Sequence, residues 1–316
     1  MSVLRVQPLL ELGMWSNYRI HAALTKYAPD FIEFTGEYKE ADDIDHSWGM
    51  PPKWEIDTTC DTYLFHSTPK GDFYRKIYWD EIEWLKELTT DVLNKPKIIL
   101  FEPHLHFGDT WITEYPRWVK DTDVLQIFVM SGYAPKHPNL ISYPQPASGR
   151  WVDEELFHVK EGIIRDEDRV ILSHDHIYEK IHHFSNPLHI LGINPNVLKP
   201  AKEGDTCCII KQQEPEKLAD LYNSLGHAVN FQPYGFESWL VEARFCGVKS
   251  YYPDVSVYRT LFGDENVGFF DLDDVEGTLK LENDMTEADI AYSRVKWGAR
   301  NRVPLFWEEV KRRIKP

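Results

Sequence analysis

Four side chains that can exchange protons lie close together in the sequence, directly after a short apolar run at residues 97–101. They are Glu102, His104, His106 and Asp109. A carboxylate or an imidazole can take the proton of a hydroxyl group and so turn that hydroxyl into a nucleophile. The spacing does not rank the four groups, and polar residues also occur in ordinary surface loops. The segment predicts a general base, with Glu102, His104, His106 and Asp109 as the candidates.

Histidine pairs provide an alternative interpretation, because imidazoles and a carboxylate together form a typical metal site. One pair is His104 and His106, and a second pair, His174 and His176, follows the apolar run at residues 169–173. On this interpretation the protein is a metal-dependent hydrolase. The sequence contains no HExxH helix and no CxxC spacing, so the histidine pairs alone support the metal hypothesis.

Two acids, Glu237 and Glu242, lie at the start and in the middle of a predicted helix at residues 237–246. A helix N-terminus presents free backbone N–H groups and the positive end of the helix dipole, which suit a diphosphate. An acid one turn further in can accept hydrogen bonds from both hydroxyls of a ribose. Glu242 is therefore the candidate for binding a ribose, and the alternative is a solvated helix acid.

Short apolar runs separated by helical patterns extend along the whole chain, which indicates an α/β fold. The predicted strands of the first half are residues 3–10, 62–66, 97–101, 124–130 and 140–143. Those of the second half are residues 169–173, 188–192, 207–210, 228–231 and 249–252. The predicted helices are residues 18–27, 80–93, 215–225 (closed by Gly226), 237–246 and a last one opened by Pro304. Most candidate residues thus follow strands, where α/β sheets bind their ligands.

A segment rich in proline and charge, residues 144–168, separates the two series of strands. Turn-forming residues followed by charged ones are typical of a linker. We therefore predict a first domain at residues 1–165 and a second at residues 166–299, with residues 300–316 packing back on the first. Two such sheets in tandem predict a central cleft between the carboxyl ends of their strands.

The second half of the chain resembles the donor-binding half of GT-B glycosyltransferases. The matching elements are a helix at residues 215–222, a strand at residues 227–233, the motif EARFCG at residues 242–247, a turn at residues 264–270 and a terminal helix at residues 307–310. The resemblance implies two Rossmann-like domains facing a central cleft, with a nucleotide-sugar held by the second. It implies transfer of a sugar to a hydroxyl acceptor; a non-catalytic nucleotide-sugar-binding protein is the alternative.

The resemblance also implies roles for individual residues. Gly13 is expected near the acceptor or the diphosphate, and Ser173 and His174 against the diphosphate. The residues expected to line the nucleotide-sugar are Tyr234, Gly235, Phe236, Glu237, Ser238 and Trp239, with Glu242 on the ribose. Glu237 and Glu242 are five positions apart, whereas many retaining members of the family space two glutamates more widely. The shorter spacing favours an inverting transfer.

The layout of the first half is similar to that of phage DNA β-glucosyltransferases, which are compact GT-B proteins. The similar features are an acid after the strand at residues 97–101 and a short donor helix that contains residues 239–243. This resemblance implies a UDP-sugar donor such as UDP-glucose, and a hydroxymethylated DNA base as acceptor, with a glycan as the alternative. No further cofactor is required, and a divalent metal is compatible but not implied.

Composition and charge limit these possibilities. The chain has 316 residues, of which 42% are apolar and 14% aromatic, which excludes a disordered or fibrous protein. There are 35 Lys and Arg against 51 Asp and Glu, a net charge of −16, which argues against a broad face for nucleic acid or membrane. Residues 294–316 carry eight basic and two acidic side chains, so this segment has a net charge of +6 and the rest of the chain has a net charge of −22. A local basic patch is therefore compatible with a DNA acceptor.

The predicted compartment follows from what the sequence lacks. No apolar run approaches the ~18 residues of a membrane span, and the first ten residues carry no basic leader. The cysteines, Cys60, Cys207, Cys208 and Cys246, have no spacing typical of a disulfide framework or a zinc site. We therefore expect reduced thiols and a cytoplasmic protein. The sequence indicates no oligomeric state.

Overall fold

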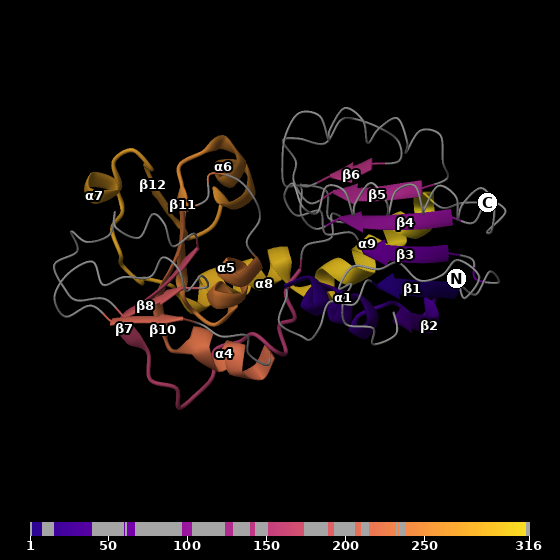
Figure 1. Cartoon of the computed structure of the whole chain (residues 1–316), viewed down its shortest axis with the longest axis horizontal. Helices are drawn as coiled ribbons and strands as arrows, with labels where there is room; N and C mark the ends of the chain where they lie inside the picture. The colour runs from indigo at the N-terminus through magenta and orange to yellow at the C-terminus, as the bar shows by residue number, and fades with distance from the viewer. Residues whose placement is uncertain are drawn as a thin grey trace. The chain divides into compact units, whose positions relative to one another are not determined.

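Two parallel β-sheets organise the chain in the computed structural model (Figure 1). The structure describes residues 2–7, 16–39, 60, 62–66, 97–102, 124–128, 140–142, 151–173, 189–192, 206–209, 215–231, 233 and 238–313. The chain divides into two compact units, the first comprising Met1–Trp151 and Arg300–Pro316, the second Val152–Ala299. In the described ranges, no helix is long and apolar enough to cross a membrane.

The sheet of the first unit has parallel strands in the order β2-β1-β3-β4-β5-β6. Their bounds are β1 Ser2–Gln7, β2 Glu33–Lys39, β3 Thr62–His66, β4 Lys97–Glu102, β5 Val124–Phe128 and β6 Leu140–Ser142. All except β2 were predicted. The charged residues Glu33, Glu37 and Lys39 interrupt the apolar pattern of β2, which is tolerated because β2 is an edge strand. The predicted helix at residues 80–93 lies outside the described residues.

Helix α9 (Ala299–Arg313) packs against the start of the first unit. The indole Nε1 of the buried Trp307 donates to the Leu24 carbonyl of α1 (Ser16–Lys26) at 3.3 Å. The same indole meets the ring of Phe34 on β2 edge-on, with centroids 5.8 Å apart. Further along α9, the Lys311 ammonium lies 4.0 Å from the centroid of the Phe31 ring. These contacts fix the last helix to α1 and β2.

The prediction that Pro304 opens the last helix is wrong, because α9 begins at Ala299. A proline inside a helix removes one backbone hydrogen bond. Ala299 and Val303 are fully buried, and the Ala299 N–H donates to the Val152 carbonyl at 2.8 Å. We attribute the earlier start to this packing, which compensates for the missing bond and holds the turn before the proline.

The sheet of the second unit has parallel strands in the order β12-β11-β10-β7-β8-β9. Their bounds are β7 Asp166–Ser173, β8 His189–Gly192, β9 Thr206–Ile209, β10 Leu225–Asn230, β11 Lys249–Pro253 and β12 Gly268–Phe270. All except β12 were predicted. With only the residues Gly268–Phe270, β12 is too short to show a strand pattern, and the sequence analysis assigned it to a turn.

Helix α4 (Pro215–Asn223) ends before Gly226, so the prediction that this glycine closes the helix is wrong. Gly226 is instead the second residue of β10. A Cβ atom at this position would lie 2.4 Å from the Glu167 carbonyl oxygen of β7. The close approach of β10 to β7 therefore requires glycine.

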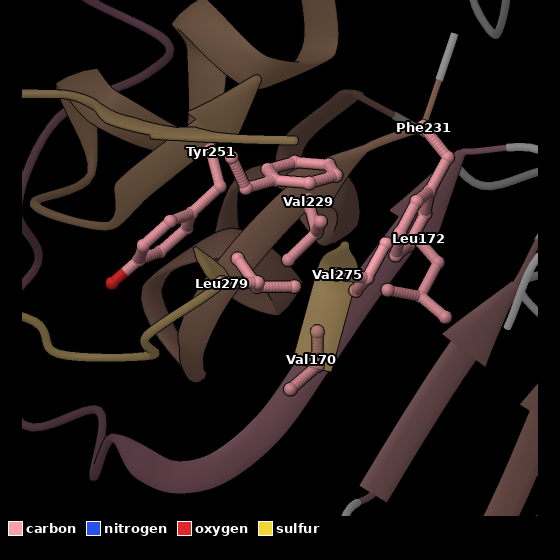
Figure 2. Packing of buried hydrophobic residues seen from close by; sticks show 8 residues of the cluster. Val170, Leu172, Val229, Phe231, Tyr251, Val275 and Leu279 are labelled. Carbon is pink, nitrogen blue, oxygen red and sulfur yellow. The ribbon is translucent and has the colours of Figure 1, made fainter. Parts of the chain in front are cut away.

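Helices and an apolar cluster cover the two faces of the second sheet. Helix α5 (Ser238–Phe245) lies against β10 and β11 and contacts α4 and α8 (Glu287–Trp297). The opposite face packs against α7 (Val275–Thr278) through buried side chains that Figure 2 shows close together. They are Val170, Leu172, Val229, Phe231, Tyr251, Phe270, Val275 and Leu279. Every residue of β10 is buried. The strand is therefore covered by packed side chains along its whole length, including its carboxyl end.

Candidate functional site

The carboxyl end of β10 and the start of α5 form the centre of the candidate site. β10 runs parallel to its neighbours β7 and β11. Asn230, the last residue of β10, lies opposite Ser173, the last residue of β7. Because α5 follows β10 and begins at Ser238, it starts at this same edge of the sheet. Ligands of α/β proteins bind at this edge.

Two buried donors lie in the first turn of α5. Ser238 and Trp239 are 3% and 8% exposed. In the part of the chain that the structure describes, neither Ser238 Oγ nor Trp239 Nε1 has a hydrogen-bond partner. The first backbone N–H groups of a helix also lack partners within the helix. A ligand rich in acceptor oxygens, such as a diphosphate or a sugar, would satisfy all of these donors.

Glu242 lies one turn further along α5 and is 3% exposed. The hydroxyl of Tyr222, which comes from the last turn of α4, donates to Glu242 Oε2 at 3.4 Å. The side chain is therefore held between two helices and is not a solvated helix acid. Its predicted contact with a ribose stays a prediction.

The end of α5 is fixed by an arginine that the sequence analysis did not single out. Arg165 donates to the carbonyls of Cys246, at 2.8 Å, and Gly247. A guanidinium at this position complements the negative end of the helix dipole. Gly247 has a φ of +83°, which favours glycine and ends the helix. Burial, reinforced by the nearby Glu242 carboxylate, raises the pKa of the Cys246 thiol to about 12, so this thiol stays protonated at neutral pH.

Arg244, a residue of α5 itself, forms a buried ion pair with Glu265. Its Nη2 also donates to Ser293 Oγ of α8 at 2.6 Å, and the Trp297 indole donates to Glu265 Oε1 at 2.8 Å. This group therefore joins α5 to α8 and to the segment before β12. A second charged residue, two positions after Glu242 in a largely apolar helix, was the available signal for it.

Asn230 is a second buried polar residue that sequence reasoning missed. Its side-chain amide donates to the Tyr258 hydroxyl at 2.8 Å, and neither residue is exposed. Tyr258 belongs to α6 (Ser256–Phe262), which follows β11. The contact therefore ties the end of β10 to the segment after β11.

The remaining predicted residues divide into two groups. Glu102 was predicted directly after its strand; it is the last residue of β4, paired with Phe128 of β5, and its role as a base stays a prediction. The others lie outside the described residues: Gly13, His104, His106, Asp109, His174, Tyr234, Gly235, Phe236 and Glu237. The structure thus brings Ser238, Trp239 and Glu242 together on α5 and leaves the assigned roles as predictions.

Among the described residues, no group of three or more His, Cys, Asp and Glu side chains could hold a metal ion. The histidine pairs of the metal hypothesis, at residues 104–106 and 174–176, lie outside these ranges.

A scan of the sequence against protein-family models gave no match, and neither did a comparison with curated protein sequences. Solved structures do match. AviGT4, a glycosyltransferase involved in avilamycin A biosynthesis, is 12% identical with a TM-score of 0.56, and the match covers 99% of this chain and 97% of AviGT4. The spinosyn forosaminyltransferase SpnP is 13% identical over 98% of this chain and 99% of its own, with a TM-score of 0.48. The UDP-GlcNAc 2-epimerase of Methanocaldococcus jannaschii is 11% identical over 98% and 99%, also at 0.48.

The chain has the GT-B fold. The similarity to AviGT4, which extends over nearly the full length of both chains, confirms the predicted α/β class and the predicted resemblance to GT-B glycosyltransferases. The predicted cleft between the two domains stays a prediction.

Proposed function

We propose that this protein is a glycosyltransferase that moves a sugar from a nucleotide-sugar donor to a hydroxyl acceptor. The observation that carries the proposal is the start of α5, where the buried Ser238 hydroxyl and Trp239 indole have no partner among the described residues. Glu242 follows one turn later on the same helix. The GT-B fold supports the proposal, because AviGT4, which shares it, is a glycosyltransferase.

In the proposed complex the second unit holds the donor, a UDP-sugar such as UDP-glucose. The diphosphate lies against Ser173, His174 and the first turn of α5, whose N–H groups and dipole stabilise its negative charge. Glu242 accepts hydrogen bonds from the ribose hydroxyls. The sugar lies along residues 234–239, and Gly13 approaches the acceptor or the diphosphate. A divalent metal is not required for this arrangement.

The proposed reaction is a direct displacement with inversion. A base among Glu102, His104 and Asp109 takes the proton of the acceptor hydroxyl as its oxygen attacks the anomeric carbon. The bond from that carbon to the diphosphate oxygen breaks, and the nucleoside diphosphate leaves with the electron pair. The acceptor is a glycan or a hydroxymethylated DNA base.

A thermal-shift panel of UDP-, GDP- and ADP-sugars tests the proposal. A ligand that binds only the folded protein raises its stability, by about 2.7 kcal/mol at one hundred times its Kd. We expect UDP-sugars to raise the melting temperature by several degrees and the other nucleotides to have smaller effects. No shift with any nucleotide-sugar, together with a clear shift on adding zinc or manganese, would contradict the proposal and favour the metal-dependent hydrolase.

A further inference from the structure

Helices α4 and α5 contact each other beside the second sheet. α4 ends at Asn223, directly before β10 begins, whereas α5 begins after β10 has ended. The last turn of α4 therefore lies toward the amino edge of the sheet. Side chains on a helix lean toward its N-terminus, so Tyr222 reaches from the amino edge toward the middle of α5.

Tyr222 is held firmly in this position. Its ring is 2% exposed and packs against Phe157, with ring centroids 5.8 Å apart. The adjacent residue, Asn223, donates to the His158 carbonyl at 2.9 Å and accepts from the Lys160 N–H at 2.8 Å. These contacts hold the end of α4 against residues 157–160 and fix the position of the Tyr222 side chain.

The fixed phenol hydroxyl meets Glu242 Oε2 at 3.4 Å, inside the contact between α4 and α5. Both partners are buried, so this contact restrains the rotamer of the carboxylate. The first turn of α5, with Ser238 and Trp239, lies toward the carboxyl edge of the sheet.

We propose that Tyr222 is a positioning residue, which orients the Glu242 carboxylate for the two hydroxyls of the donor ribose. The inference rests on the proposed function, because it assigns the ribose of a nucleoside diphosphate to Glu242. Tyr222 itself does not touch the ligand. Its hydroxyl acts only through the carboxylate.

The test compares Tyr222→Phe with the unmodified protein in binding UDP and 2′,3′-dideoxyuridine diphosphate, measured by calorimetry. The contact is long, at 3.4 Å, and losing the net contribution of an ordinary hydrogen bond corresponds to roughly a 3- to 10-fold weaker Kd. We expect this loss for UDP and no loss for the dideoxy ligand, which has no hydroxyls for Glu242 to bind. In a Glu242→Gln background, Tyr222→Phe should have no further effect on UDP.

Tyr251→Phe is the matched control. It also removes a buried phenol, whose hydroxyl donates to the Glu282 carbonyl at 2.6 Å, and it should leave both affinities unchanged. If Tyr222→Phe weakens both ligands equally, or neither, while the unmodified protein binds UDP, the positioning role is wrong and the proposed function stands. If UDP, GDP and ADP all fail to bind the unmodified protein, the proposed function falls and this inference with it.

Discussion

His227 is a buried imidazole in the middle of the second sheet, and its burial predicts an acid sensitivity. Burial lowers the pKa of His227 to about 4, and a nearby backbone carbonyl and the Asp168 carboxylate only partly oppose this effect. At pH 7 the imidazole is neutral in the folded and the unfolded chain. Between pH 6.5 and about 4 only the unfolded chain binds the proton, so stability falls as the pH falls through this window. The loss is at most about 3 kcal/mol.

This prediction is checked by denaturant unfolding at several pH values between 7 and 4, with the protein and its His227→Gln variant in parallel. The variant should lose less stability over the window, even if it is less stable at pH 7. Parallel curves for the two proteins would show that His227 does not contribute to the pH dependence.

The type of each candidate residue on α5 could be predicted from the sequence, but its surroundings could not. The helix and the position of Glu242 one turn from its start follow from the local pattern. The contact with Tyr222 joins residues 20 positions apart, and a helical pattern on either segment does not reveal which faces meet. The burial of Ser238 and Trp239 was missed for the same reason.

At the scale of elements, the Arg244–Glu265 ion pair should dominate the attachment of α5 to α8. Breaking a buried pair by removing one partner leaves an unpaired buried charge and costs roughly 3–5 kcal/mol. Glu265→Gln is therefore expected to lower the free energy of unfolding by about this amount. Combining it with Arg244→Met removes the unpaired charge and should restore part of the loss. Urea unfolding of both variants measures these changes.

The element boundaries show where local patterns are sufficient. Apolar runs predicted all of the described strands except β2 and β12. β2 was missed because its charges are allowed at an edge, and β12 because it is short. The errors at Gly226 and Pro304 share one cause. One was interpreted as a helix end and the other as a helix start, and in both places packing against a residue distant in sequence decides the structure. Glu167 lies beside Gly226, and Val152 accepts from the Ala299 N–H at the start of α9.

At the scale of the whole molecule, the net charge of −16 conceals the basic C-terminal segment, residues 294–316, but much of that charge has local partners. Lys296 pairs with Asp264 at 2.5 Å, and Arg312 donates to both oxygens of Glu309. Lys311 lies over the Phe31 ring. Glu309 is already counted in the local charge of +6, but Asp264 lies outside the segment, so its pairing with Lys296 lowers the positive potential of a track for DNA. This favours a glycan as the acceptor.

A DNA duplex containing hydroxymethylated bases should therefore bind weakly, with little dependence on salt. A protein that contacts six or more phosphates loses roughly 10³-fold in affinity or more between 50 and 200 mM salt, because bound counterions are released. We expect less than about a twofold change over this range, measured by fluorescence anisotropy with a labelled duplex. We also expect Lys311→Ala, which removes one basic side chain of this segment, to leave the affinity unchanged. Tight binding with a steep salt dependence, weakened by this variant, would instead favour the modified DNA base as the acceptor.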